Sequence, residues 1–188
     1  MKNAEALASS LFVDGWYTPA IKHVSPHVNE RPDVSIDLLV IHNISLPAGT
    51  FSTPYVRDLF LGQLDCCADP SFADLEGVEV SAHFFINRAG SIEQFVPIDK
   101  RAWHAGVSSW CGRENCNDFS VGIELEGTDE DPYTEVQYQS LVLLTQALMG
   151  VTGITADAIV GHCDIAPARK TDPGPSFDWP YYRQLLEA

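Results

Sequence analysis

The chain has 188 residues, of which 45% are hydrophobic and 20% are charged, and this size and composition predict one compact domain with a single hydrophobic core. Its 26 acidic and 11 basic side chains give a formal net charge of -15, which would repel nucleic acid and anionic membrane surfaces. We therefore expect no nucleic-acid or membrane partner, and we expect a monomer. A small anionic ligand is compatible with this charge, because the local field depends on where the few cations lie.

The sequence indicates neither a cleaved leader nor a transmembrane segment. The apolar stretch at 6–13 is interrupted by two serines and closed by Asp14, unlike the continuous apolar region of a signal peptide. No apolar run approaches the roughly 18 to 20 residues that a bilayer requires. We expect a cytoplasmic protein with reduced thiols, because the five cysteines form no paired CxxC pattern. A bridge between Cys111 and Cys116 stays open as the alternative.

The first predicted elements are a buried strand and a short helix. Residues 36–41 form a continuous apolar run rich in branched side chains, which predicts a central strand that ends at His42. Residues 54–64 predict a short helix with one apolar face. This helix lies within a long acidic segment, 51–80, and long insertions in compact domains are often functional. We therefore hypothesise that this segment moves when a ligand binds.

The middle of the chain predicts a β-hairpin and a further strand. Two strand-like runs, 80–86 and 91–96, flank the sequence Asn-Arg-Ala-Gly at 87–90, whose glycine favours a tight turn. A strand is predicted over 119–125, because apolar and other residues alternate there. Glu124 lies on the face of this strand opposite to its apolar row.

A long helix and a last short strand follow. Thr134 and Gln137 form a capping box at the start of an amphipathic helix predicted over 134–150. Residues 158–161 predict a strand that ends at His162. Strands and helices interleave, and the hairpin requires antiparallel pairing. The predicted fold class is therefore α/β: a single domain with a central mixed β-sheet flanked by α-helices.

Two histidines at predicted strand ends are candidates for a metal site. His42, His162 and the acidic loop residue Asp172 would form a three-ligand zinc site with a fourth position open. The alternative is that each histidine only caps its strand through hydrogen bonds, since the fold alone can bring such distant residues together. His83 lies in an otherwise buried strand, and we assign it a structural role.

Several motifs occur in order along the chain: VIHNIS at 40–45, SAHF at 81–84, RAWHAG at 101–106, VGIELEG at 121–127 and GHCDIAP at 161–167. They resemble the N-acetylmuramoyl-L-alanine amidase family, which shares its fold with peptidoglycan-recognition proteins. The sequences RKTDPG at 169–174 and FDW at 177–179 are similar to the cytoplasmic branch that acts on anhydromuramyl-peptides. The resemblance implies a single zinc amidase domain over 1–188, with its core at about 16–180.

By this resemblance, one Zn²⁺ per chain is held by His42, His162 and Asp172. Many relatives have cysteine where this chain has Asp172, and a carboxylate is a sound substitute, because its oxygen binds zinc at about 2.0 to 2.2 Å. Asp164 is the rival acid near His162. We expect Asp164 to cap a turn instead, because it lies beside the sequence Ile-Ala-Pro.

The resemblance also implies two catalytic residues. Glu124 matches the family's general base, and a carboxylate on a strand that faces a metal site suits that role. Glu126 shares its face of the strand and is the alternative. Lys170 lies two residues before the third ligand, where its positive charge would stabilise a developing oxyanion. The alternative is that Lys170 is an ordinary surface lysine.

Candidate substrate contacts are less constrained by the sequence. Trp103 and His104 would offer a flat apolar wall and a hydrogen-bonding edge to the sugar or lactyl group, and Asn43 would bond the peptide. Arginine binds carboxylates through paired hydrogen bonds. The candidates for the carboxylates of the peptide are therefore Arg88, Arg101 and, first among them, Arg113.

The function that the resemblance implies is zinc-dependent hydrolysis of the amide bond between the lactyl group of N-acetyl-anhydromuramic acid and L-alanine. The expected partner is an anhydromuramyl-peptide, and the expected role is recycling of peptidoglycan fragments, which lowers the pool that induces β-lactamase. A non-catalytic peptidoglycan-binding module on the same fold is the alternative, and loss of a ligand would mark it. A secreted amidase acting on intact cell wall is a third reading, against which the missing leader argues.

Overall fold

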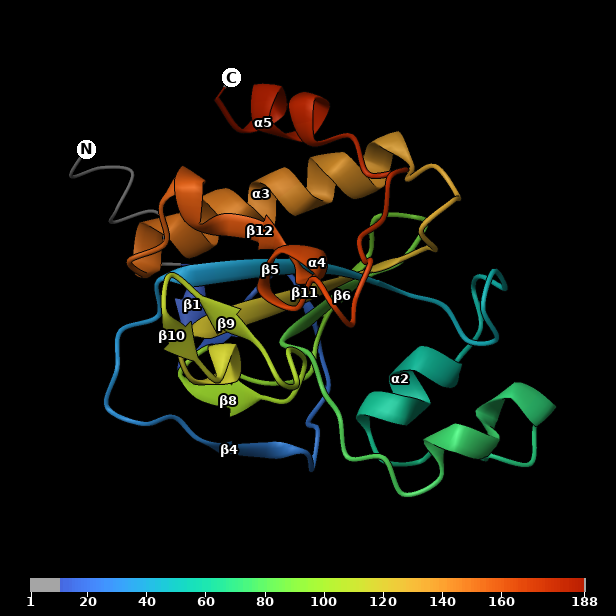
Figure 1. Ribbon diagram of the computed structural model, residues 1–188. Coiled ribbons are helices and arrows are strands. Elements are labelled where there is room, and N and C mark those ends of the chain that lie inside the picture. The colour runs from blue at the N-terminus through green and yellow to red at the C-terminus, as the bar shows by residue number, and fades with distance from the viewer. Residues whose placement is uncertain (1–10, 188) are drawn as a thin grey trace.

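The computed structural model describes residues 11–187, so most of the apolar stretch at 6–13 lies outside the described residues. A six-stranded mixed β-sheet forms its centre (Figure 1), with the strand order β12-β5-β11-β6-β7-β3. The predicted α/β class with a central mixed sheet is confirmed. The strands are β3 (Ile21–Lys22), β5 (Leu38–Ile44), β6 (Phe84–Ile86), β7 (Ile92–Gln94), β11 (Ser120–Glu126) and β12 (Ile159–Gly161).

The neighbouring strands β12, β5 and β11 run parallel, so their carboxyl ends meet at one edge of the sheet. The strand predicted to end at His42 is longer than expected, because β11 stays paired with β5 as far as Ile44. Leu39 and Ile41 therefore pack into the largest core cluster, whereas Val40 packs into a smaller cluster on the opposite face. His42 follows this alternation and shares the face of Val40.

Strands β6 and β7 form the predicted antiparallel hairpin, with Phe84 paired to Gln94. Both strands are shorter than the sequence runs 80–86 and 91–96. The flanking residues of the two runs form backbone hydrogen bonds outside the β6–β7 pairing. The N–H of Ser81 donates to the carbonyl of Trp103, and the carbonyl of Phe95 accepts from the N–H of Ser25. The bond to Trp103 connects the hairpin to a loop that borders the cleft described below.

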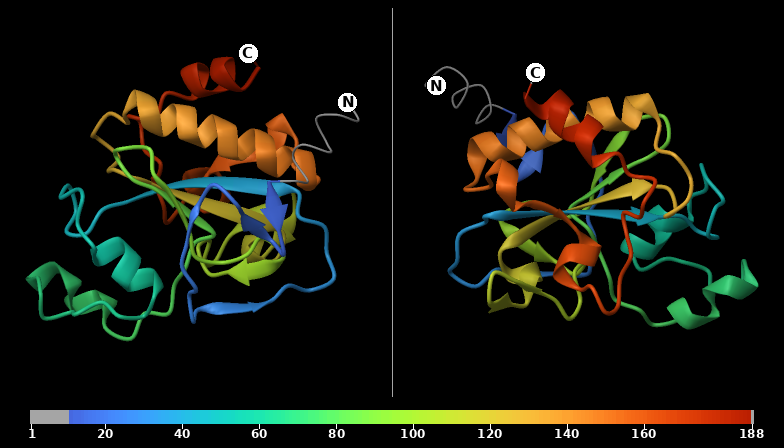
Figure 2. Two further views of the ribbon diagram at one scale, coloured as in Figure 1. Left: turned by 180° about the vertical axis from the view of Figure 1, so that it is seen from behind. Right: turned by 45° about the horizontal axis from the view of Figure 1, so that its top comes forward.

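Helix α3 (Glu135–Val151) lies over one face of the sheet, and helix α5 (Trp179–Glu187) packs on α3 on that same side (Figures 1 and 2). The capping box is confirmed: the Thr134 hydroxyl accepts from the N–H of Gln137 at 3.3 Å, and the Gln137 side chain accepts from the N–H of Thr134 at 3.0 Å. The sequence analysis did not predict α5. It packs through Tyr182, whose hydroxyl lies 2.8 Å from that of Thr145 on α3.

On the other side of the sheet, α2 (Tyr55–Phe60) and the 3₁₀ helix η1 (Pro70–Leu75) form a separate lobe (Figure 1). The helix predicted over 54–64 is shorter than expected, because Gly62 adopts a left-handed conformation with φ of +64° and ends it. Val56, Leu59 and Phe60 anchor α2 to a core cluster that includes Phe85 and Phe95 of the hairpin region.

The other elements are short, and the sequence analysis predicted none of them. They are β1 (Phe12–Val13), β2 (Trp16–Tyr17), β4 (Val28–Glu30), β8 (Lys100–Ala102), β9 (Ser109–Trp110), β10 (Arg113–Glu114), η2 (Cys116–Asp118), η3 (Ala156–Ala158) and α4 (His162–Ile165). A strand of two residues is too short to show a periodicity, so the short strands leave no recognisable pattern in the sequence. Within residues 11–187 no helix is both long and apolar enough to cross a bilayer.

Candidate active site

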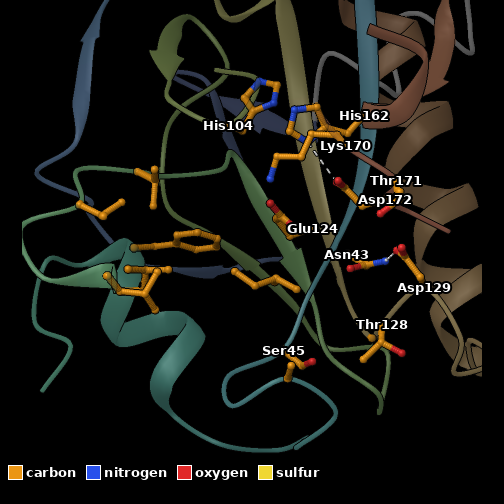
Figure 3. A pocket seen from close by; sticks show the side chains of 18 of the residues that line it. Asn43, Ser45, His104, Glu124, Thr128, Asp129, His162, Lys170, Thr171 and Asp172 are labelled. Atoms are coloured by element: carbon orange, nitrogen blue, oxygen red, sulfur yellow. Dashed lines mark hydrogen bonds and ion pairs between the residues drawn. The ribbon is translucent and has the colours of Figure 1, made fainter. Parts of the chain in front are cut away.

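The carboxyl edge of the parallel strands opens into a cleft of about 830 Å³. Strand β5 contributes Asn43, β11 contributes Glu124, and His162 follows β12 directly as the first residue of α4. A loop after α4 adds Lys170 and Asp172 (Figure 3). The N–H of Cys163 donates to the carbonyl of Asp172 at 3.0 Å and so holds this loop beside α4. Side chains from four separate parts of the chain therefore converge at one edge of the sheet.

His42, His162 and Asp172 meet at the end of this cleft. The Nδ1 atoms of the two histidines lie 2.9 Å apart, and Oδ2 of Asp172 lies 3.1 Å from each of them. These three residues form a group that could hold a metal ion. Two imidazole nitrogens and a carboxylate oxygen are the donor set of three-ligand zinc sites.

The protonation states of His42 and Asp172 suit the binding of a metal cation. Burial lowers the pKa of His42 to about 4, although the hydrogen bond to Asp172 opposes this shift, so the imidazole is neutral at pH 7. With its proton on Nε2, the ring could offer the Nδ1 lone pair to a metal ion in place of the hydrogen bond to Asp172. Burial alone would raise the pKa of Asp172, but hydrogen bonds from His162 and His42 outweigh it and lower this pKa below its ordinary value. The carboxylate is therefore ionised, and the site carries a negative charge that a metal ion would neutralise.

Glu124 projects into the same cleft and is 8% exposed. Its Oε2 atom is buried and has no hydrogen-bond partner among residues 11–187. Burial and the nearby Asp172 carboxylate raise its pKa well above the ordinary value, and Lys170 partly offsets this shift. A buried carboxyl group with a free oxygen in a cleft is a candidate general base.

Glu126, the alternative to Glu124, has a different role in the structure. Its two carboxylate oxygens accept from the backbone N–H groups of Ser52 and Arg88. Glu126 therefore ties the start of the 51–80 segment to the hairpin turn, and it does not line the cleft.

Lys170 lines the cleft, and its side chain points toward Glu124 (Figure 3). The rival acid Asp164 is turned away from the histidine pair, because its carboxylate accepts from the N–H of Gly161 at 2.7 Å at the start of α4. This is the capping role predicted for it. His83 is fully buried, and its Nδ1 accepts from the N–H of Gly122 at 3.1 Å.

The candidate substrate contacts divide into two groups. Asn43, Trp103 and His104 line the cleft. Arg113 does not: its guanidinium forms paired hydrogen bonds of 2.7 and 2.8 Å to Asp37 and lies 3.5 Å from the ring centre of Phe119. The guanidinium is thus already paired with a carboxylate.

The two other arginines considered for the peptide are also engaged elsewhere. Arg88 donates to the carbonyl of Pro132, and Arg101 pairs with Asp118 at 2.6 Å. The arginine that does line the cleft is Arg169, which donates to the carbonyls of Ala105 and Val107 at 2.8 and 2.9 Å.

The sequence analysis missed two further residues at the site, Asp129 and Asn117. Asp129 accepts from the side-chain amide of Asn43 at 2.8 Å (Figure 3). Asn117 accepts from the N–H groups of His104 and Ala105 at 3.1 and 2.8 Å. Asp129 lies in a loop and Asn117 in the short helix η2. A polar residue in either place is ordinarily solvated, so only the fold reveals what each one holds.

Comparison with known proteins identifies the family of this chain. The family model described as N-acetylmuramoyl-L-alanine amidase matches residues 32–175. The protein named 1,6-anhydro-N-acetylmuramyl-L-alanine amidase AmpD from Salmonella typhimurium (strain SL1344) is 55% identical over 173 residues, which are 92% of this chain and 92% of that protein.

Two solved structures extend the comparison. A crystal structure of a selenomethionine AmpD derivative superposes with a TM-score of 0.91 at 55% identity, covering 94% of this chain and 99% of that one. The amidase AmiD of Escherichia coli, solved in complex with the substrate anhydro-N-acetylmuramic acid-L-Ala-D-gamma-Glu-L-Lys, gives a TM-score of 0.60 at 31% identity, covering 84% of this chain and 60% of AmiD. The chain therefore belongs to the N-acetylmuramoyl-L-alanine amidase family of hydrolases.

Proposed function

We propose that this protein hydrolyses the amide bond between the lactyl group of N-acetyl-anhydromuramic acid and the L-alanine of the stem peptide, and that it requires zinc. The observation that carries the proposal is the free, buried Oε2 of Glu124 in the same cleft as the group of His42, His162 and Asp172. The similar proteins named above, which are described by their action on or binding of anhydromuramyl compounds, support this substrate class.

Zinc bound to these three side chains would polarise the amide carbonyl and lower the pKa of water. Glu124 accepts the proton of the attacking water and passes it to the nitrogen of the leaving alanine. Its raised pKa suits both steps, because the group must take a proton and then release it near neutral pH. Lys170 stabilises the negative charge that develops on the carbonyl oxygen.

The remaining cleft residues bind and orient the substrate. Trp103 is 37% exposed, and its indole N–H donates to Asn29 at 2.6 Å, which fixes the ring at the rim of the cleft. This flat surface suits the apolar face of a sugar ring. The amide of Asn43 is held by Asp129, so the Asn43 carbonyl oxygen is left to accept from an N–H of the peptide.

The direct test is release of stem peptide from anhydromuramyl-tripeptide by the purified protein, before chelation, after chelation and with zinc restored. The proposal requires that cleavage disappears with the metal and returns with zinc. Muramyl-tripeptide assayed in parallel reports whether the anhydro sugar is required. A zinc-loaded protein that binds the fragment without cleaving it would overturn the proposal in favour of a peptidoglycan-binding module.

The proposal includes a role for a monomer in the cytoplasm, where it would recycle peptidoglycan fragments and limit the pool that induces β-lactamase. The five cysteines are free, including Cys111 and Cys116, which suits a reducing compartment. Fractionation of cells that produce the protein, with anhydromuramyl-peptide levels measured with and without its gene, tests this part. Accumulation of fragments in the cytoplasm on loss of the gene is the expected result.

A further inference from the structure

One short segment, His104–Ala105, lies directly behind both histidines of the metal group. The Nε2 atom of His42 lies 2.9 Å from Nδ1 of His104, and the Nε2 atom of His162 lies 3.1 Å from the carbonyl oxygen of Ala105. The Nδ1 atoms of the two histidines face each other and Asp172 instead. Each ligand ring therefore has one nitrogen directed to the site and the other directed to this dipeptide.

A bound metal would fix the tautomers of these rings. An Nδ1 that offers its lone pair to a metal requires the proton of the neutral ring to be on Nε2. His42 can then donate to Nδ1 of His104, and the remaining N–H of His104 can donate to the hydroxyl of Ser120, which lies 3.2 Å from Nε2.

The segment is itself held from several sides. The side-chain oxygen of Asn117, a residue that is 4% exposed, accepts from the N–H groups of both His104 and Ala105. Arg169 donates to the carbonyl of Ala105. On the sheet side, the His104 ring lies against Gly122 of β11, where any Cβ would overlap the ring. Gly122 is therefore required for space, so that the ring can approach the strand.

We propose that His104 is a positioning residue for the metal site: it holds His42 by accepting from its Nε2–H, and Gly122 provides the space that this arrangement needs. Hydrogen bonds to the outer nitrogen of a ligand histidine orient the ring and raise its basicity. This inference rests on the proposed function only in so far as a metal occupies the site. It replaces the substrate-contact role that the sequence suggested for His104.

The experiment compares zinc affinity, measured by competition with a chromophoric chelator, and the absorption spectrum of the cobalt-substituted protein. His104→Phe keeps a ring of similar size and removes the acceptor, so it should weaken zinc binding by about 10- to 100-fold and alter the cobalt spectrum. His104→Asn places a carboxamide oxygen near the position of Nδ1, and it should restore most of the affinity. Unaltered zinc affinity and cobalt spectrum in His104→Phe, with a raised KM alone, would overturn the proposal and return His104 to the substrate site.

A second pair of variants guards against a folding defect. Gly122→Ala should weaken zinc binding, because its methyl group displaces the His104 ring, whereas Gly153→Ala, whose new Cβ would make only a contact of 3.4 Å, should not. Equal affinities in these two variants would contradict the role of Gly122. A wild-type protein that binds zinc, loses it in His104→Phe and yet never cleaves anhydromuramyl-tripeptide would support the positioning role and overturn the proposed function.

Discussion

Glu124 lies directly opposite His42 in the register of the parallel strands β11 and β5. Neighbouring strands are about 4.8 Å apart, and paired residues direct their side chains to the same face. The candidate base and one candidate ligand are therefore placed by the most buried part of the sheet rather than by loops. This arrangement gives the site a rigid frame.

Glu124→Gln should abolish most amidase activity while zinc still binds. Removal of a general base typically lowers the rate by about 10²- to 10⁴-fold, and the amide keeps the size of the carboxylate. The measurement is kcat/KM for anhydromuramyl-tripeptide together with zinc content. Glu126→Gln is the matched control, because its carboxylate serves the backbone of Ser52 and Arg88. It should lower stability by about 1 to 3 kcal/mol and reduce activity far less; equal losses of activity in both variants would contradict the assignment of the base.

The buried carboxyl of Glu124 should make the metal-free protein less stable as pH rises. Its pKa is raised in the folded state, whereas in the unfolded chain it is about 4.3. The folded state thus binds the proton more tightly, and the unfolding free energy falls as pH increases from the unfolded pKa through the folded one. Glu124→Gln removes this dependence and should be more stable than the wild type at neutral pH.

Urea unfolding of both metal-free proteins between pH 4 and pH 8 tests this prediction. The difference in unfolding free energy should grow with pH, and it should shrink when zinc is added, because a nearby cation favours the ionised carboxylate. A difference that is constant over this pH range would show that Glu124 titrates equally in the folded and unfolded states.

The sequence indicated the elements whose patterns are long and local. Helix α3 was predicted from its periodicity and its capping box at Thr134, and the central strands from their apolar runs. The metal group was predicted from motif resemblance, because no local pattern connects His42 with Asp172. The structure brings them together through the parallel pairing of β12 and β5 and the loop that follows α4.

What the sequence could not indicate are the contacts between loops. His104 was expected to offer a hydrogen-bonding edge to the substrate. It does line the cleft, but both of its ring nitrogens also lie within hydrogen-bond distance of groups in the protein, which the sequence did not indicate. Arg113 was chosen by its nearness in sequence to the motifs, yet it pairs with Asp37, whose position depends on where β5 begins. Such pairings depend on tertiary packing, which neither propensity nor periodicity encodes.

Asp172→Asn should weaken zinc binding by more than about 100-fold, since it removes the charge from a proposed direct ligand, and loss of a direct ligand costs more affinity than loss of an outer hydrogen-bond partner. Asp164→Asn is the matched control. Its side chain bonds the N–H of Gly161 and lies outside the metal group, so it should retain zinc and lose about 1 kcal/mol of stability. Isothermal titration of both metal-free variants with zinc gives the comparison, and tight binding by Asp172→Asn with weak binding by Asp164→Asn would reverse the choice of ligand.

Arg31 should be the arginine whose loss most destabilises the fold around the site. Its guanidinium donates to the carbonyls of Ile98, Asn117, Asp118 and Ser120 at 2.7 to 3.1 Å, and so joins β11 to the helix η2 that carries Asn117. Burial lowers its pKa to about 10, an effect that Asp118 partly offsets, and the group stays charged at neutral pH.

Arg31→Met leaves these four carbonyl groups without their donor, and it should reduce the unfolding free energy by about 3 kcal/mol or more. Arg31→Lys should recover little of this loss, because an ammonium group cannot reach acceptors in several directions as the planar guanidinium does. Arg183→Met is the control: Arg183 also donates to backbone carbonyls, of Ala156 and Ile159, but at 3.2 and 3.4 Å and largely at the surface. Urea midpoints with unchanged m-values give the ranking. Equal losses in Arg31→Met and Arg183→Met would mean that solvent replaces the Arg31 bonds and that Arg31 does not stabilise this region.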